Sequence, residues 1–139
     1  MRNKENIQLG VGAIVFKDDA VLLVQRKNPP NQYQWAIPGG KVNYGEPLKD
    51  AVEREILEET NVVIHALEPV YTFEIIETSN TSDTPFHYVV IDFEAQYISG
   101  VPTANDDAVK AEWISRKAFS SLEVNNITQN LLKEKFNFP

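Results

Sequence analysis

Residues 40–62 read GKVNYGEPLKDAVEREILEETNV, a glycine-bounded loop that leads into a run with helical spacing. On the 3.6-residue period of an α-helix, positions 48, 52, 55 and 59 share one face, which is the spacing of a buried stripe. The first two are Leu48 and Val52, whereas the last two are Glu55 and Glu59. Burying an ionised carboxylate is costly unless it is paired or bound to a cation. The stripe therefore predicts a helix whose apolar face continues into a cation site.

Glu58 adds a third acid, one turn from Glu55 and next to Glu59. Oxygen ligands of this kind suit hard divalent cations. The alternative is an ordinary solvated helix face on which Arg54 and Glu58 form an i,i+4 ion pair. The loop before the helix favours a functional site, because glycines ahead of a helix N-terminus let the backbone approach a phosphate or a metal.

The whole segment resembles the signature of the Nudix hydrolase family. That signature is glycine, five residues, glutamate, seven residues, Arg-Glu, an aliphatic residue, any residue, Glu-Glu, any residue, glycine and an aliphatic residue. The matching positions here are Gly40, Glu46, Arg54, Glu55, Ile56, Glu58, Glu59 and Val62. Asn61 departs from the pattern, because it stands where the family has the second glycine. That glycine ends the helix in a left-handed conformation, which Asn tolerates next best, so the acids are unaffected.

The resemblance implies hydrolysis of a pyrophosphate bond with Mg²⁺, for which Mn²⁺ can substitute. The implied substrate is a nucleoside diphosphate linked to another moiety, above all ADP-ribose or a similar nucleotide sugar. Water is a poor nucleophile and phosphate oxygens are negative, so the reaction needs a metal to activate the one and neutralise the other. The expected metal ligands are Glu55, Glu59, Glu58 and the backbone carbonyl of Gly39.

The other acids and Arg54 have expected roles in the same site. Arg54 would orient the acids or contact phosphate, and Glu46 would brace the loop against the helix. The general base is open between Glu55 and an acid of a later loop, as in many members of the family. Asp106 and Asp107 are the candidates in that loop, with an ordinary polar turn as their alternative.

Recognition of the substrate is assigned to basic and aromatic residues near the glycine loop, by which we mean residues 38–46. Arg26 and Lys41 are expected to contact phosphate, or else to be solvated. Trp35 and Tyr33 are expected to stack on a base, or else to belong to the core. We expect the loops at residues 28–35 and 100–107 to choose the substrate.

Length and composition predict one ordinary globular domain over residues 1–139, since the chain is 42% hydrophobic and 24% charged. The net charge of −7 argues against a nucleic-acid polymer as partner, because such surfaces are rich in Lys and Arg. The apolar runs are too short to span a bilayer, so no membrane association is expected. The absence of cysteine excludes disulfides and thiolate metal sites and fits a cytoplasmic location.

Strand and helix patterns alternate along the chain in the order of an α+β or α/β sandwich. The expected strands are residues 8–16, 21–26, 35–37, 62–76 with a break at Pro69, 86–98 and 111–114. The expected helices are residues 47–60, a short helix capped by Ser115, and residues 124–136. By resemblance, the fold is a Nudix-type α/β/α sandwich with a mixed sheet and the signature as a loop–helix–loop.

Two alternative functions and the oligomeric state stay open at this point. The first is a nucleoside triphosphate sanitising enzyme of the MutT kind. The second, from another class of protein, is a domain that binds a nucleotide metabolite as a sensor without cleaving it, although such modules usually lose the acids that are present here. For the oligomeric state, a homodimer is the expectation, because relatives are often dimers.

Overall fold

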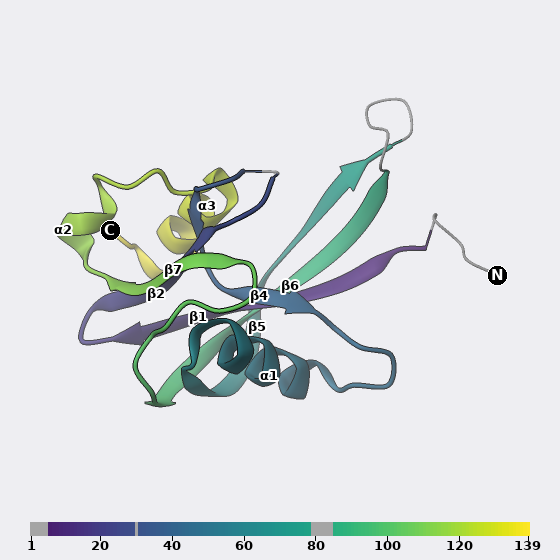
Figure 1. Cartoon of the computed structure of the whole chain (residues 1–139), viewed down its shortest axis with the longest axis horizontal. Coiled ribbons are helices and arrows are strands. Elements are labelled where there is room, and N and C mark those ends of the chain that lie inside the picture. The colour runs from purple at the N-terminus through teal and green to yellow at the C-terminus, as the bar shows by residue number, and fades with distance from the viewer. Residues whose placement is uncertain (1–5, 30, 79–84) are drawn as a thin grey trace.

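The computed structural model describes residues 6–29, 31–78 and 85–139, so Pro30 of the loop expected at residues 28–35 lies outside it. The described residues form seven strands and three helices, with helices on both faces of a sheet (Figure 1). In chain order the elements are β1 (Gln8–Lys17), β2 (Ala20–Arg26), β3 (Trp35–Ala36), β4 (Gly39–Lys41), α1 (Leu48–Thr60), β5 (Val63–Glu77), β6 (Phe86–Ser99), β7 (Ala108–Ile114), α2 (Arg116–Phe119) and α3 (Asn126–Phe136).

The sheet is mixed, with β1 at its centre. Its strand order is β3-β2-β1-β6-β5, with β4 paired to β1 and β7 paired to β2. β1 and β6 run parallel, and the other pairs are antiparallel. On one side, β1 pairs first with β4 and then, from Phe16 onward, with β2. Between these partners the carbonyl of Pro38 accepts a hydrogen bond from the N–H of Ala13 at 3.1 Å, so the glycine loop is held at a division of the sheet.

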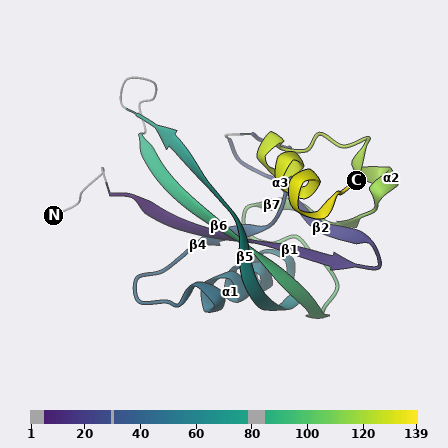
Figure 2. The same ribbon diagram turned by 180° about the vertical axis from the view of Figure 1, so that it is seen from behind.

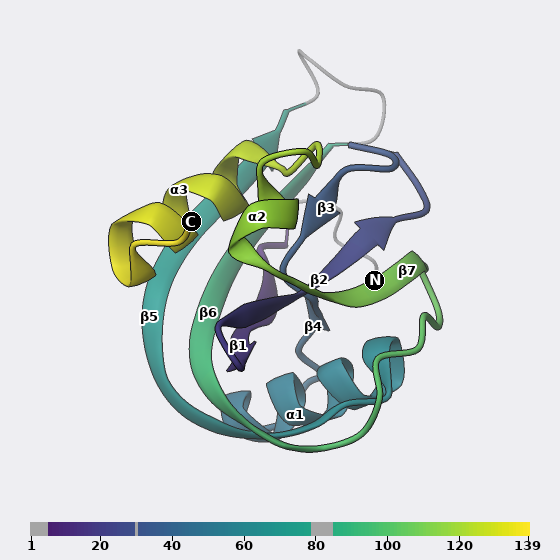
Figure 3. The same cartoon turned by 90° about the vertical axis from the view of Figure 1, so that its left-hand side faces the viewer.

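Successive residues of β1 point to opposite faces of the sheet, as the pleat requires. Val11 and Val15 belong to an apolar cluster with Val52 and Ile56 of α1. Ile14 belongs instead to a second cluster, whose other members include Trp35, Phe119, Leu131, Leu132 and Phe138. Figure 3 shows α1 inside the curve of the sheet, with α2 and α3 on the other side of β1. The expected α+β sandwich with a mixed sheet is confirmed.

β5 is one strand through Pro69, so the predicted break at this residue is wrong. The pairing with β6 shifts register on both sides of Pro69, which shows how the missing N–H is accommodated. β5 also lies at the edge of the sheet, where proline is tolerated. Together β5 and β6 extend beyond the body of the molecule as a long two-stranded arm, seen from both sides in Figures 1 and 2.

Other boundaries differ from expectation by a few residues. Part of the predicted glycine loop is β4, because Gly39–Lys41 pairs with β1. α1 begins at Leu48 with Pro47 as its N-cap, and α3 begins at Asn126, where the Asn125 side chain accepts hydrogen bonds from two backbone N–H groups. Ser115 caps α2, as predicted, by accepting from the N–H of Ala118.

The C-terminal end of α1 is closed by residues that are distant in sequence. Asn61 takes the left-handed conformation, with φ of 65°, as predicted. The N–H of Thr103 donates to the carbonyl of Thr60 at 2.9 Å, and the N–H of Asn105 donates to that of Glu59 at 3.0 Å. These bonds satisfy carbonyls that a helix end leaves without partners. They also hold residues 100–107 beside the acids of α1.

Among the helices of the described ranges, none is both long enough and apolar enough to cross a membrane.

Candidate functional site

Arg54 joins the loop before α1 to the helix itself. Its Nε lies 2.7 Å from Oε2 of Glu46, and its Nη2 lies 2.9 Å from Oε1 of the same carboxylate. Such a two-point bond fixes both the distance and the plane of the guanidinium. Nη2 also donates to the carbonyl of Lys41 at 3.0 Å, which ties the end of β4 to the helix. These contacts fit the expectation that Glu46 braces the loop against the helix.

The electrostatics of this pair keep both partners charged. The hydrogen bonds from Arg54, followed by one from the N–H of Asn43, lower the pKa of Glu46 to about 2. The Glu46 carboxylate in turn raises the pKa of Arg54 above its ordinary value, with Glu55 adding to the effect. Glu46 and Arg54 are thus a permanent ion pair near neutral pH, suited to holding geometry and unsuited to exchanging protons.

Arg54 also contacts two of the acids predicted to bind metal. Its Nη1 lies 3.0 Å from Oε2 of Glu55 and 3.2 Å from Oε1 of Glu58. Glu55 is 18% exposed, whereas Glu58 is 50% exposed. The Glu55 carboxyl lies so close to Gly40 that a β-carbon there would overlap it. Gly40 is therefore required by the close approach of β4 to the acid.

Glu59 lies under the glycine loop. Its Oε1 accepts a hydrogen bond from the N–H of Gly39 at 3.1 Å. Removal from water raises the pKa of Glu59 to about 7, the Gly39 hydrogen bond and the charge of Arg26 lower it, and the charges of Glu55 and Asp107 raise it. The groups that act on this carboxyl come from β2, the glycine loop, α1 and the loop before β7.

Asp107 and Arg26 are brought to this point by tertiary contacts. The backbone carbonyl of Asp107 accepts from the N–H of Lys27 at 2.9 Å, and its Oδ1 accepts from Nδ2 of Asn28 at 3.3 Å. These bonds join the end of β2 to the loop before β7. Asp106 is an exposed turn residue with φ of 53°, which fits the alternative of an ordinary polar turn for this acid.

The three predicted carboxylate ligands, Glu55, Glu58 and Glu59, lie on α1 without forming a complete metal site by themselves. Within the described ranges, no three carboxylate or imidazole groups converge as a complete metal site. Glu58 is 50% exposed and, like Glu55, contacts Nη1 of Arg54. Burial raises the pKa of Glu59, and repulsion by the charge of Glu55 raises it further. A hard cation would offset that repulsion, with water and substrate oxygens as its remaining ligands, so the donors present fit a divalent metal.

The residues predicted to bind substrate do not all lie near the acids of α1. Trp35 is 5% exposed and belongs to the second apolar cluster, so its ring has no free face and the stacking role is corrected to a core role. Tyr33 is 57% exposed beside the end of β2, where its N–H donates to the carbonyl of Arg26. Lys41 lies opposite Gly10 on the sheet face away from α1, with Nζ 6.0 Å from the ring centre of Tyr88. Its ammonium therefore faces away from the acids.

Sequence reasoning missed Asp92, a 1% exposed carboxyl in the middle of β6. Its signal was an acid inside the apolar run VVIDF, which a strand would place in the core. Asn28 and Asn105 were also missed, because they act through loop contacts that no local pattern reveals.

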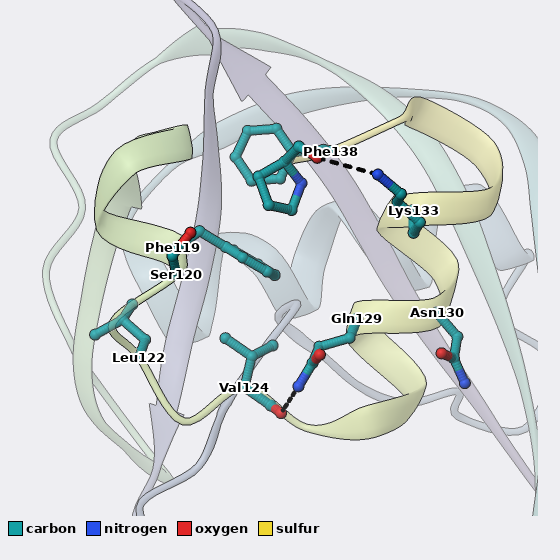
Figure 4. A pocket seen from close by; sticks show the side chains of 9 residues that line it. Phe119, Ser120, Leu122, Val124, Gln129, Asn130, Lys133 and Phe138 are labelled. Carbon is teal, nitrogen blue, oxygen red and sulfur yellow. Dashed lines mark hydrogen bonds between the residues drawn. The ribbon is translucent and has the colours of Figure 1, made fainter.

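One cavity of about 520 Å³ lies away from these residues. It is formed by α2, α3 and the C-terminal residues, including Phe119, Leu122, Gln129 and Phe138, as Figure 4 shows. None of the acids described above is among the residues that line it. The cavity is therefore separate from the site at the end of α1.

Comparison with known proteins adds a family and several relatives. The NUDIX domain profile matches residues 6–134. An ADP-ribose pyrophosphatase of Methanocaldococcus jannaschii is 38% identical over 107 residues, which is 76% of this chain and 60% of that protein. An oxidized purine nucleoside triphosphate hydrolase of Mus musculus is 28% identical over 102 residues, which is 72% of this chain and 61% of that protein. The chain thus spans about three fifths of the length of these two curated relatives.

Among solved structures, the MutT NUDIX hydrolase from Burkholderia pseudomallei superposes with a TM-score of 0.80. Its sequence is 27% identical, and the alignment covers 94% of this chain and 99% of that one.

Proposed function

This chain belongs to the Nudix family, and we propose that it hydrolyses the pyrophosphate bond of a nucleoside diphosphate linked to a second moiety. The observation that carries the proposal is the contact of Glu59 with the Gly39 backbone beside Glu55, which is itself bonded to the Arg54 guanidinium. Acids, a guanidinium and a backbone segment at one point are the parts that phosphoryl chemistry needs.

Glu55, Glu59, Glu58 and the carbonyl of Gly39 are the groups that would hold Mg²⁺ or Mn²⁺. When bound, such an ion supplies charge neutralisation for the phosphate oxygens and a lowered pKa for water. The protein's own task is to keep these ligands in place. The N–H of Gly39 holds Glu59, and the Arg54 guanidinium holds Glu55 while it is itself held by Glu46.

Arg26 is proposed to contact a phosphate oxygen, because its charge already acts on Glu59. Glu55 and Asp107 are the two candidates for taking a proton from the attacking water, since each lies close enough to raise the pKa of Glu59. Replacing each by the amide distinguishes them. Loss of the base lowers kcat at neutral pH, and the loss is relieved as the pH rises.

ADP-ribose is the leading substrate, supported by the 38% identity to the Methanocaldococcus jannaschii ADP-ribose pyrophosphatase. An oxidised purine nucleoside triphosphate is the second candidate, supported by the 28% identity to the mouse hydrolase. A cytoplasmic location is part of the same proposal, because a chain without cysteine suits a reducing compartment. A homodimer is likewise proposed and is tested by light scattering in solution.

A nucleotide panel tests the function directly. Phosphate or nucleoside monophosphate release is measured from ADP-ribose, other nucleoside diphosphate sugars and nucleoside triphosphates with Mg²⁺ and with Mn²⁺. We expect ADP-ribose to give the highest kcat/KM, and we expect EDTA to abolish turnover. Glu59→Gln should lower kcat by about 100-fold or more, since it removes a metal ligand.

Glu68→Gln is the matched control, because Glu68 is 79% exposed and pairs with Lys49. Its kcat should stay within about twofold of the wild-type value, since an exposed ion pair contributes little. Hydrolysis of no nucleotide, or full activity in Glu59→Gln, contradicts the proposal.

A further inference from the structure

Asp92 is a buried acid that the proposed reaction does not use. It lies in the middle of β6, is 1% exposed, and its Oδ2 has no hydrogen-bond partner in the part of the chain that the structure describes. A buried polar atom without a partner destabilises the fold, whereas an apolar side chain of the same size would not. Such an atom therefore calls for a functional explanation.

The position of Asp92 relates it to the glycine loop. Asp92 lies opposite Gly12 in the register between β6 and β1. A β-carbon on Gly12 would lie 2.5 Å from Oδ1 of Asp92, 3.2 Å from the carbonyl oxygen of Pro38 and 3.3 Å from Cδ1 of Ile37. The carboxyl therefore adjoins the residue that precedes Gly39, on the sheet face away from α1.

The same sheet face continues outward from Asp92 as an aromatic surface on the arm. Residues directly opposite each other in adjacent strands point to one face, and so do alternate residues along a strand. Asp92 is opposite Tyr71, Val90 is opposite Phe73, and Tyr88 is opposite Ile75. The rings of Tyr71 and Phe73 lie 6.1 Å apart, and those of Phe86 and Tyr88 lie 5.7 Å apart. We call these six side chains, Tyr71, Phe73, Ile75, Phe86, Tyr88 and Val90, the aromatic surface.

The polar groups next to this surface suit a nucleotide. Lys41, at the end of the glycine loop, places Nζ 6.0 Å from the ring centre of Tyr88. A planar base gains from contact with aromatic rings, and an ammonium close to one of these rings adds a cation–π contact at the edge of the surface. A carboxyl oxygen with a free lone pair accepts a hydrogen bond, which directs it toward an N–H group of the base.

We propose that Asp92 is a specificity-determining residue whose Oδ2 accepts a hydrogen bond from the exocyclic amino group of an aminopurine lying on the aromatic surface. The inference rests on the proposed function, because it names the base of that nucleotide substrate. The 1% exposure of Asp92 means that the base reaches it by displacing a neighbouring side chain, for which Ile37 is the nearest candidate.

Binding of two nucleoside monophosphates without metal tests the proposal apart from catalysis. AMP carries the amino group, and purine riboside 5′-monophosphate lacks it but is otherwise the same. Calorimetry should show the wild-type protein binding AMP about tenfold more tightly, the size expected for one hydrogen bond to a carboxylate. Asp92→Leu should reduce the ratio to within about twofold, and Asp92→Asn, which keeps one carbonyl acceptor, should retain part of it.

Melting temperature separates this role from a structural one. Asp92→Leu should raise the melting temperature, because it replaces a buried carboxyl lacking a partner with an apolar group. A lower melting temperature together with equal weakening of both ligands would show that Asp92 only supports the fold. Glu94→Gln, an exposed acid on the same strand, serves as control and should keep the wild-type ratio.

The two proposals fail in different ways. A ratio near one in the wild-type protein, or an unchanged ratio in Asp92→Leu, overturns the role of Asp92 even if nucleotides are hydrolysed. A ratio that depends on Asp92 in a protein that cleaves no nucleotide supports this inference and contradicts the proposed function.

Discussion

Arg54 holds the candidate site together through contacts on three sides. It binds Glu46 in the loop, Glu55 and Glu58 on the helix, and the carbonyl of Lys41 in β4. A guanidinium can do this because its five donors lie in one rigid plane, which Lys cannot reproduce. The position of the Glu55 carboxylate, proposed to bind metal, therefore depends on the partner that holds Arg54 in place.

Glu46→Gln tests this dependence. The amide keeps the shape of the side chain but removes the charge, so Arg54 should shift toward Glu55 and compete with the metal. We expect kcat/KM to fall about tenfold, with half-saturation requiring more Mg²⁺, while Glu68→Gln leaves both unchanged. Unchanged metal dependence in Glu46→Gln would show that Arg54 is held by its other contacts.

The same pair predicts a response to acid. Because the folded-state pKa of Glu46 is lowered to about 2 from 4.5, its contribution to stability is present above pH 4.5 and is lost as the pH falls toward 2. Acid unfolding followed by circular dichroism should therefore show a smaller difference between wild type and Glu46→Gln at pH 2 than at pH 5.

α1 is the element on which the site is built, and its two ends serve different purposes. Its last turn is closed by Asn61 in the left-handed conformation and by N–H groups of Thr103 and Asn105. Gly100, with φ of 102°, packs against the Asn61 backbone, where a β-carbon would overlap the carbonyl. The cap thus positions the loop that carries Asp107.

Substitution of Asn61 measures the cost of its departure from the family signature. Asn61→Gly should raise the free energy of unfolding by about 0.5 kcal/mol, because glycine adopts φ of 65° without steric cost. The gain is limited by loss of the bond from Nδ2 of Asn61 to the carbonyl of Val101 at 3.4 Å. Asn61→Ala should lower the free energy of unfolding by about 1 kcal/mol. Alanine has neither the freedom of glycine at positive φ nor the side-chain hydrogen bond of Asn61. Urea unfolding checks the order Gly, Asn, Ala, and any other order contradicts it.

The molecule as a whole combines a net charge of −7 with two acids that are expensive to ionise in the fold. Burial raises the pKa of Asp92 to about 7, and burial also raises that of Glu59 to about 7. Between the ordinary carboxyl pKa and pH 7, the folded state therefore binds more protons than the unfolded chain. In this range the free energy of unfolding falls as the pH rises.

Asp92→Asn should flatten this pH dependence. The variant cannot ionise, so its stability relative to wild type should increase from pH 4 to pH 7, by at most about 4 kcal/mol at about 1.4 kcal/mol per pKa unit. Urea unfolding in EDTA at pH 4, 5.5 and 7 measures the difference. The exposed Glu94→Gln control should remain within about 0.5 kcal/mol of wild type throughout. A constant offset for Asp92→Asn would show that Asp92 is already ionised in the fold.

Local patterns were enough to predict α1, its capping residue and the alternation of strands and helices. Helical period, glycine spacing and the conformational tolerance of Asn act within a few residues, so the primary structure alone encodes them. The structure also contains the Arg54–Glu58 ion pair that the alternative of a solvated helix face predicts, and the contact of Arg54 with Glu46 joins the loop to the helix.

The neighbours of the acids and the burial of individual residues depend on contacts between distant segments. Arg26 and Asp107 meet Glu59 because β2, α1 and the loop before β7 pack together, Trp35 enters the core because its strand lies under α3, and Asp92 is buried because β6 lies between β1 and β5. Sheet register and loop packing depend on the whole chain, since each pairing is stabilised by residues far away in sequence. The acids proposed for the site could therefore be predicted from the segment around α1, whereas their neighbours and the proposed base-binding surface depend on how the strands pack, because that packing involves the whole chain.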